Sequence, residues 1–206
     1  AAPPFYMNIS QEELIAYYQK LAEEVPLPLF LYNMPSHTKI SIELSTVKTL
    51  SAHPNIIGIK DSSGDLSYFE GLCRAFRDYQ GFRIFVGPEE ILLQTLRLGG
   101  HGGVTGGANL FPRLYTSLFV AFENQDFEKP EKLQETILFL SQQLYQNNQY
   151  QSSYLKGLKA AMGFENLCKG ILAPPLAAYS ESEKKTLKAK YELVKEKVEQ
   201  SLSLQG

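Results

Sequence analysis

Short apolar runs alternate with longer amphipathic stretches in the first part of the chain, and this alternation restricts the fold more than any other feature. Short apolar runs predict strands at 27–32, 56–60 and 82–86, and a glycine-rich fourth strand is expected at 102–105. Amphipathic stretches predict helices at 11–24, 42–53, 67–76, 89–98 and 114–123. Strands separated by helices pair in parallel, because each helix returns the chain to the same end of the sheet. We therefore expect an α/β fold.

The pattern changes after residue 125, where helical stretches follow one another without an intervening strand. These helices are expected at 130–146, 154–162 and 183–202. We therefore divide the chain into an α/β domain at 1–125 and a helical extension at 126–206. Four parallel strands fit either half of a (β/α)8 barrel or a small doubly wound sheet. In both folds the chemistry lies at the carboxyl ends of the strands.

Composition excludes some classes of function. The 20 basic and 22 acidic residues give a formal charge of −2, without the basic excess of proteins that bind nucleic acid or membrane surfaces. Cys73 and Cys168 form no C-x-x-C motif, which favours reduced thiols in a cytoplasmic protein. His37, His53 and His101 lack ligand spacing, so no metal site is expected. The sequence contains neither a membrane-spanning apolar run nor a signal-peptide pattern.

Lys60 and Tyr32 each end a predicted strand, in Ile-Ile-Gly-Ile-Lys and Phe-Leu-Tyr respectively. Apolar surroundings disfavour the ammonium form of a lysine, and a neutral amine can attack a ketone to form an imine. If the two strands are neighbours, the Tyr32 hydroxyl can relay protons as the imine forms. The alternative for Lys60 is a side chain that reaches solvent or pairs with Asp61. The alternative for Tyr32 is a core tyrosine with a main-chain partner.

A dense glycine run occupies residues 99–107, but it matches neither the dinucleotide-binding nor the Walker pattern. Its backbone amides can approach a carboxylate or phosphate closely, or the glycines serve close packing alone. His101 within this run is interpreted as structural. Asp61 is expected to point away from the lysine before it, because strand side chains alternate. Asp65 and Glu89 are expected to be acids at helix N-termini.

Two motifs occur in a specific order. Residues 32–38 read Tyr-Asn-Met-Pro-Ser-His-Thr, and residues 58–65 read Gly-Ile-Lys-Asp-Ser-Ser-Gly-Asp. This pairing resembles the dihydrodipicolinate synthase and N-acetylneuraminate lyase superfamily. Further matches follow the order of the family's barrel strands, at 3–6, 86–87 and 99–112, so the similarity covers nearly the whole chain.

The resemblance implies a (β/α)8 TIM barrel, of which this chain covers about strands 5 to 8, followed by a C-terminal helical extension. It implies a class I aldolase or lyase that needs no metal or organic cofactor. Lys60 matches the lysine that forms an imine with pyruvate or another 2-oxo acid, and Tyr32 matches the proton-relay tyrosine. Tyr6 matches a tyrosine that reaches into a partner subunit's site, and a homo-oligomer, dimer or tetramer, is implied.

The other matched positions are predicted to bind substrate. Gly87 is a backbone neighbour, Val104 packs beside the bound pyruvate, and His37 and Thr38 follow the Tyr32 strand. His37 stands where dihydrodipicolinate synthases commonly have arginine, whose bidentate fork an imidazole does not replace. We therefore expect a 2-oxo-3-deoxy sugar acid aldolase. A 4-hydroxy-tetrahydrodipicolinate (dihydrodipicolinate) synthase is the alternative, and a non-catalytic barrel remnant is a second one.

The chain opens on Ala-Ala-Pro-Pro-Phe-Tyr, which is typical of a strand end that runs into a loop. We expect that an N-terminal portion of the barrel is missing from this sequence. That portion is expected to hold the family's Gly-Thr-Thr-Gly-Glu loop, which binds the pyruvate carboxylate. Half a barrel leaves strand edges unpaired, so this segment alone is expected to be inactive and poorly soluble.

Overall fold

The computed structural model describes residues 1–146, 150 and 152–203. The chain divides into two compact units, Ala1–Val104 and Thr105–Gly206, and each is described by itself. The first unit contains the parallel sheet and the second is helical. The domain boundary expected at residue 125 follows a helix of the second unit, and it stays a prediction.

The described residues of the first unit form a parallel sheet in the order β1-β2-β3. The strands are β1 (Leu29–Asn33), β2 (Ile56–Asp61) and β3 (Arg83–Val86), so the first three strand predictions are confirmed with small shifts at their ends. Ala1 lies beside the outer edge of β1: its nitrogen donates to Phe30 O at 2.7 Å, and Tyr32 N donates to Ala1 O at 2.8 Å. These bonds follow the pattern of a parallel ladder.

The prediction of a full strand at 102–105 is wrong. The segment continues the pairing beyond β3 only as an isolated parallel bridge between Val86 and Gly103. Gly102 has a φ of 139°, which interrupts an extended backbone, and neighbouring glycines offer no side chains to pack. Main-chain bonds to β3 persist, since Val86 N donates to Gly102 O at 3.0 Å and Val104 N donates to Val86 O at 2.9 Å.

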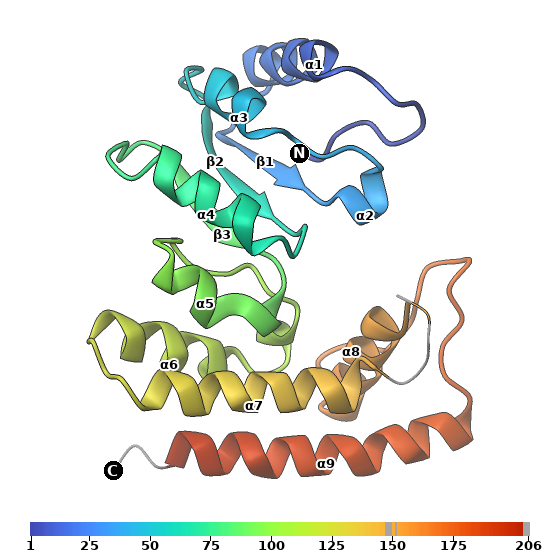
Figure 1. Cartoon of the computed structure of the whole chain (residues 1–206). Helices are drawn as coiled ribbons and strands as arrows, with labels where there is room; N and C mark the ends of the chain where they lie inside the picture. Colours follow the sequence, from blue (N-terminus) through green and yellow to red (C-terminus); the bar gives the residue numbers. More distant parts are fainter. Residues whose placement is uncertain (147–149, 151, 204–206) are drawn as a thin grey trace. The chain divides into compact units, whose positions relative to one another are not determined.

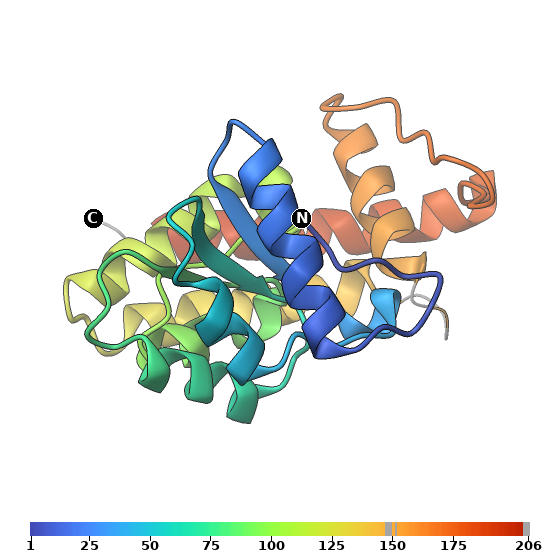
Figure 2. The same ribbon diagram turned by 90° about the horizontal axis from the view of Figure 1, so that it is seen from above.

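The two faces of the sheet differ in burial. One face carries apolar side chains that are at most 1% exposed: Leu31, Ile59 and Ile84. The helices α3 (Leu44–Leu50) and α4 (Leu66–Ala75) lie together on one side of the sheet, as both views show (Figures 1 and 2). The other face carries half-buried side chains, namely those of Phe30, Tyr32, Lys60 and Phe85. This second face is therefore the less buried of the two.

Local signals explain the helices of the first unit. Helix α1 (Gln11–Glu24) has the predicted bounds and begins with a capping box: Glu13 N donates to Ser10 Oγ at 3.2 Å, and Ser10 N donates to Glu13 Oε2 at 2.7 Å. The helix expected at 89–98 begins as the 3-10 turn η1 (Glu89–Ile91) and continues as α5 (Leu92–Arg97). A short helix, α2 (Pro35–Thr38), follows β1.

The second unit contains the 3-10 turn η2 (Gly107–Asn109) and the helices α6 (Pro112–Glu123), α7 (Lys129–Leu144), α8 (Ser152–Phe164) and α9 (Glu181–Ser203). Helix α7 packs between α6 and α9 (Figure 1). Its completely buried side chains recur at helical spacing, at Leu133, Ile137, Leu140 and Leu144. The three helices predicted after residue 125 are therefore confirmed. Among the described helices, none combines the length and apolar character needed to cross a membrane.

Candidate active site

Lys60 and Tyr32 lie side by side at the carboxyl ends of β2 and β1. The parallel register pairs Tyr32 with Lys60, so both side chains occupy the half-buried face of the sheet. Lys60 Nζ lies 4.7 Å from the centre of the Tyr32 ring, within the range of a cation–π contact. The structure thus brings together the two residues that the sequence predicted to be catalytic.

Met34 holds the hydroxyl group of that tyrosine. Tyr32 Oη donates to Met34 Sδ at 2.8 Å, and Met34 is the residue that precedes α2. Sequence reasoning missed Met34, because a thioether is a weak acceptor and methionine is most often a core filler. The contact fixes the direction in which the phenol points at the end of β1.

Two aromatic side chains, those of Phe30 and Phe85, lie on the same face of the sheet as Lys60, and we call them the aromatic floor. Lys60 pairs with Phe85 on β3, and the rings of Phe30 and Phe85 lie 5.6 Å apart between centroids. Gly58, two residues before the lysine on the same face, leaves room for this floor. A Cβ at Gly58 would lie 2.2 Å from Phe30 Cε1 and 2.4 Å from Arg83 O. Glycine is therefore needed at this position for the side chains to close beneath the lysine.

Gly87 and Ser62 flank the lysine on its other side. A Cβ at Gly87 would lie 3.3 Å from Lys60 Cε and 1.9 Å from Ser62 Oγ. The structure therefore places Gly87 beside the lysine, and the glycine leaves room for the Ser62 hydroxyl. The role of Gly87 in binding substrate stays a prediction. Ser62 was missed because a serine after a strand is ordinarily a turn residue. Val104 is 52% exposed, and its main chain pairs with the end of β3.

The remaining predicted substrate-binding residues differ in exposure. His37 lies exposed on α2, where its Nδ1 shares a hydrogen bond of 2.9 Å with Ser36 Oγ. Thr38 is buried, and its hydroxyl lies 3.2 and 3.0 Å from two main-chain carbonyls, to which it donates. Tyr6 is 93% exposed among the described residues. Roles for these three residues in binding substrate stay predictions.

Asp61 points to the opposite face from Lys60, as predicted. Its carboxylate is 1% exposed and accepts from Asn33 Nδ2 at 2.8 Å and from Ser63 Oγ at 2.9 Å. Asp65 caps α4 by accepting from Ser67 N at 2.9 Å, which confirms its predicted role at a helix start. His101 Nδ1 accepts from Ile84 N at 3.1 Å, and burial lowers the pKa of its imidazole, as suits a structural histidine.

Comparison with known proteins agrees with this arrangement. The model of the Dihydrodipicolinate synthetase family matches residues 1–194. The chain belongs to the dihydrodipicolinate synthetase family. The superfamily resemblance carried by residues 32–38 and 58–65 is confirmed.

Named relatives share this assignment. A 4-hydroxy-tetrahydrodipicolinate synthase of Thermodesulfovibrio yellowstonii is 36% identical over 130 residues, 63% of this chain and 44% of that protein. The structure of dihydrodipicolinate synthase from Bacteroides thetaiotaomicron is 42% identical, with a TM-score of 0.88 over 93% of this chain and 64% of that one. YagE of E. coli K12, a protein of the dihydrodipicolinic acid synthase family solved with pyruvate, is 26% identical, with a TM-score of 0.83 over 94% of this chain and 65% of that one.

These neighbours establish the fold class. They are TIM-barrel proteins, so the prediction of part of a (β/α)8 barrel with C-terminal helices is confirmed. The chain spans about half the length of the curated relatives it matches.

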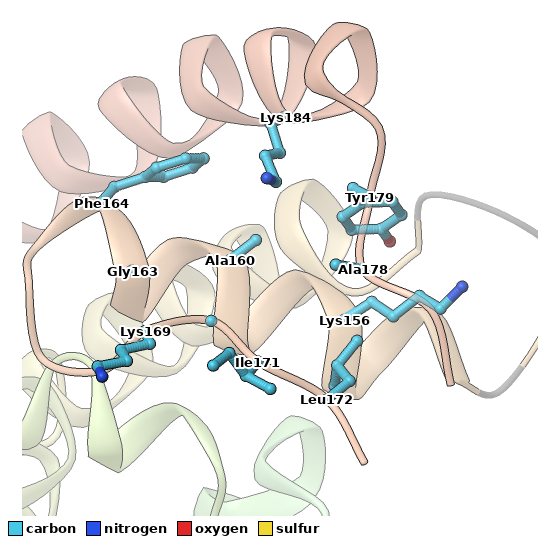
Figure 3. Close-up of a pocket in the computed structure, with 11 residues that line it drawn as sticks. Lys156, Ala160, Gly163, Phe164, Lys169, Ile171, Leu172, Ala178, Tyr179 and Lys184 are labelled. Carbon is cyan, nitrogen blue, oxygen red and sulfur yellow. The ribbon is translucent and has the colours of Figure 1, made fainter. Parts of the chain in front are cut away.

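A cavity of about 490 Å³ lies in the second unit of this family member. Figure 3 shows Lys156, Lys169 and Lys184 around an apolar wall that includes Ile171 and Leu172. None of the residues that line this cavity was predicted from the sequence to be catalytic or to bind substrate. Over residues 1–146, 150 and 152–203, no cluster of three or more His, Cys, Asp or Glu side chains is suited to hold a metal ion.

Stability is expected to depend on pH through Asp61. Burial raises the pKa of this carboxyl, while hydrogen bonds from Asn33 and Ser63 oppose the rise. A carboxyl whose pKa is higher in the folded than in the unfolded state binds protons more tightly when folded. The free energy of unfolding therefore falls as pH rises from about 3.9, the unfolded pKa, through the higher folded pKa. Asp61→Asn cannot titrate and should lack this fall.

The measurement is urea unfolding of both proteins between pH 4 and pH 8. The stability of Asp61→Asn relative to the natural chain should increase with pH across the window and then level off. Taking the difference between the two proteins removes the contribution of other carboxyls. A constant difference across the whole range would show that the pKa of Asp61 is not raised in the folded chain.

Proposed function

We propose that the complete protein is a Schiff-base-forming lyase that condenses pyruvate with aspartate semialdehyde, the reaction of a 4-hydroxy-tetrahydrodipicolinate synthase. One observation carries the proposal: the Lys60 amine lies over the Tyr32 ring at 4.7 Å, at the carboxyl ends of paired strands, where barrel enzymes hold their chemistry. The synthase names of the relative at 36% identity and the structure at 42% identity support this choice of substrates.

The chemistry needs a nucleophilic amine and a group that moves protons. Lys60 Nζ attacks C2 of pyruvate and forms a C–N bond, and the C2 oxygen leaves as water to give a protonated imine. Loss of a proton from C3 produces an enamine, because the iminium nitrogen takes up the electron pair. C3 then attacks the aldehyde carbon, whose oxygen is protonated as the C–C bond forms. We assign these proton transfers to Tyr32, because it is the register partner of Lys60 on the neighbouring strand.

A second candidate is a 2-oxo-3-deoxy sugar acid aldolase, favoured by one observation. His37 presents an exposed imidazole on α2, where a bidentate arginine would suit the carboxylate of aspartate semialdehyde better. This reaction uses the same imine but breaks the C3–C4 bond. The test compares condensation of pyruvate and aspartate semialdehyde with cleavage of 2-oxo-3-deoxygluconate. Faster condensation is expected, and faster cleavage would instead establish the aldolase.

Tyr32→Phe is expected to lower kcat about a hundredfold, the usual contribution of a positioned proton donor. The substitution keeps the ring against Lys60 and removes only the hydroxyl. Lys60 should therefore still be tagged when pyruvate and borohydride are added, but more slowly. Steady-state kinetics provide the measurement, and Tyr17→Phe on α1, whose ring is 38% exposed, is the control. If kcat of Tyr32→Phe stays within about twofold of the natural protein, the proton-relay role is rejected.

We also infer that the protein is a homo-oligomer that uses the segment around Tyr6. Phe5, Tyr6 and Met7 are 74%, 93% and 68% exposed, an unusual run of large apolar side chains in solvent. Aromatic residues of this kind often anchor subunit interfaces. Tyr6→Ala is expected to weaken subunit association about tenfold, measured by sedimentation equilibrium. Unchanged association would show that this segment is not an interface.

A further inference from the structure

We propose that Asn33 and Asp61 are positioning residues that align Tyr32 with Lys60 from the opposite face of the sheet. The proposal rests on the imine chemistry proposed for Lys60. Asn33 directly follows Tyr32, and Asp61 directly follows Lys60. Asn33 and Asp61 are register partners, and so are the two predicted catalytic residues. Because strand side chains alternate, the Asn33–Asp61 contact lies behind the site and cannot touch substrate.

The pair is enclosed and its hydrogen bonds have a defined direction. Both side chains are 1% exposed, and Asn33 Nδ2 donates to Asp61 Oδ1 at 2.8 Å. Asn33 Oδ1 accepts from Ile42 N at 3.0 Å, which fixes the orientation of the amide with its nitrogen toward the carboxylate. Asp61 accepts in addition from Ser63 N at 3.2 Å and Ser63 Oγ at 2.9 Å.

Main-chain hydrogen bonds of Asn33 and Asp61 connect this pair to the neighbouring strand ends. Ser62 N donates to Asn33 O at 2.7 Å, and Gly87 N donates to Asp61 O at 2.7 Å. The ends of all three strands, the loop before α3 and the loop before α4 therefore meet at Asn33 and Asp61. A displacement of Asn33 or Asp61 is transmitted directly to Tyr32, Lys60 and Ser62, because each is a neighbour in sequence.

Burying the Asp61 carboxylate costs free energy, which indicates that the pair serves to align the strands and not to stabilise the fold. A buried carboxylate is expensive, and apolar residues of similar shape often give equal or greater stability. The hydrogen bond of the pair favours one register of β1 against β2. A shift of β1 by one residue against β2 would exchange the faces of its side chains, placing Asn33 toward the site and removing its bond to Asp61. The hydrogen bond is available in the one register that pairs Tyr32 with Lys60.

The test uses two substitutions in the complete protein and two readouts: the rate at which pyruvate and borohydride tag Lys60, and kcat. Asn33→Asp places two carboxylates against each other, and they can bond only while they share a proton. Its tagging rate and kcat, each divided by the natural protein's value at the same pH, should fall about tenfold or more between pH 5.5 and pH 8.5. The nearby groups Asp65 and Tyr68 on α4 are unchanged in both proteins.

Asp61→Asn is the conservative variant, because its Oδ1 can still accept from Asn33 while its Nδ2 donates to Ser63 Oγ. Its tagging rate and kcat should stay within about threefold of the natural protein. Asn55→Ala is the matched control for lost stability. Asn55 precedes β2 at the opposite end, and its Nδ2 donates to the carbonyls of Ala22, Val25 and Leu27 at 2.9, 3.0 and 3.0 Å. It should lower the melting temperature and leave kcat unchanged.

Each alternative result has a distinct meaning. If Asn33→Asp keeps its tagging rate and kcat at every pH, or if Asn55→Ala loses as much kcat, the pair is merely structural and the proposal is overturned while the imine chemistry stands. If Lys60 of the natural protein is never tagged, the proposed function fails, and the positioning role fails with it.

Discussion

Lys60→Ala is expected to abolish imine formation with pyruvate and to lower turnover by at least about three orders of magnitude. The imine nitrogen is the electron sink of the proposed reaction, and the substitution removes the amine that supplies it. Tyr32, the register partner, has no group that forms an imine, and the floor beneath consists of aromatic rings. Mass spectrometry after borohydride reduction in the presence of pyruvate checks the result. The natural protein should carry one reduced pyruvate on Lys60, and the variant should carry none.

Lys48→Ala is the matched control, since Lys48 lies exposed on α3. It should be tagged at Lys60 and turn over like the natural protein. Two results would contradict the imine mechanism. Tagging of Lys60→Ala at another lysine with full activity would assign the chemistry to a different residue. Absence of any tag on the natural protein would favour the non-catalytic barrel remnant instead.

The sequence predicted the strands and helices that position this site, because they depend on local patterns. Three strands and the helices between them follow from apolar periodicity, and the ends of parallel strands meet at one edge. Tyr32 and Lys60 both end predicted strands, so their proximity required only that the two strands be neighbours, which the structure shows. The alternation of strand side chains also predicted that Asp61 turns away from Lys60.

Other features depended on three-dimensional geometry that no local pattern determines, and they were missed. Met34 became visible only when α2 placed its sulfur 2.8 Å from the Tyr32 hydroxyl. The bond between Asn33 and Asp61 requires a register that no local pattern determines. The glycine run gave the opposite error, because a strand was predicted where a positive φ at Gly102 leaves an isolated bridge. For the substrate, one residue, His37, favoured the sugar acid aldolase, whereas the named relatives favour the synthase.

Gly58→Ala is expected to lower the free energy of unfolding by about 3 kcal/mol, the effect of overpacking a closed site. The added Cβ would lie 2.2 Å from Phe30 Cε1 and 2.4 Å from Arg83 O. The ring of Phe30 has little freedom to move aside, because the ring of Phe85 lies 5.6 Å away. The carbonyl belongs to the backbone of β3, which is paired to β2 at this residue. Relief therefore requires the strands to separate beneath Lys60.

Gly71→Ala is the matched control, because it adds the same methyl group in the same unit without a clash. Gly71 lies within α4, and its nearest atom would be Leu44 Cδ2 at 3.6 Å, an ordinary contact. Alanine is favoured over glycine in a helix, so stability should rise by up to about 1 kcal/mol. Urea unfolding of the two variants should show changes of opposite sign in the free energy of unfolding. An unchanged free energy of unfolding in Gly58→Ala would show that the added methyl group fits above the aromatic floor without a clash. Since the strands separate beneath Lys60 in Gly58→Ala, this variant should also form the pyruvate imine more slowly when folded, and Gly71→Ala should not.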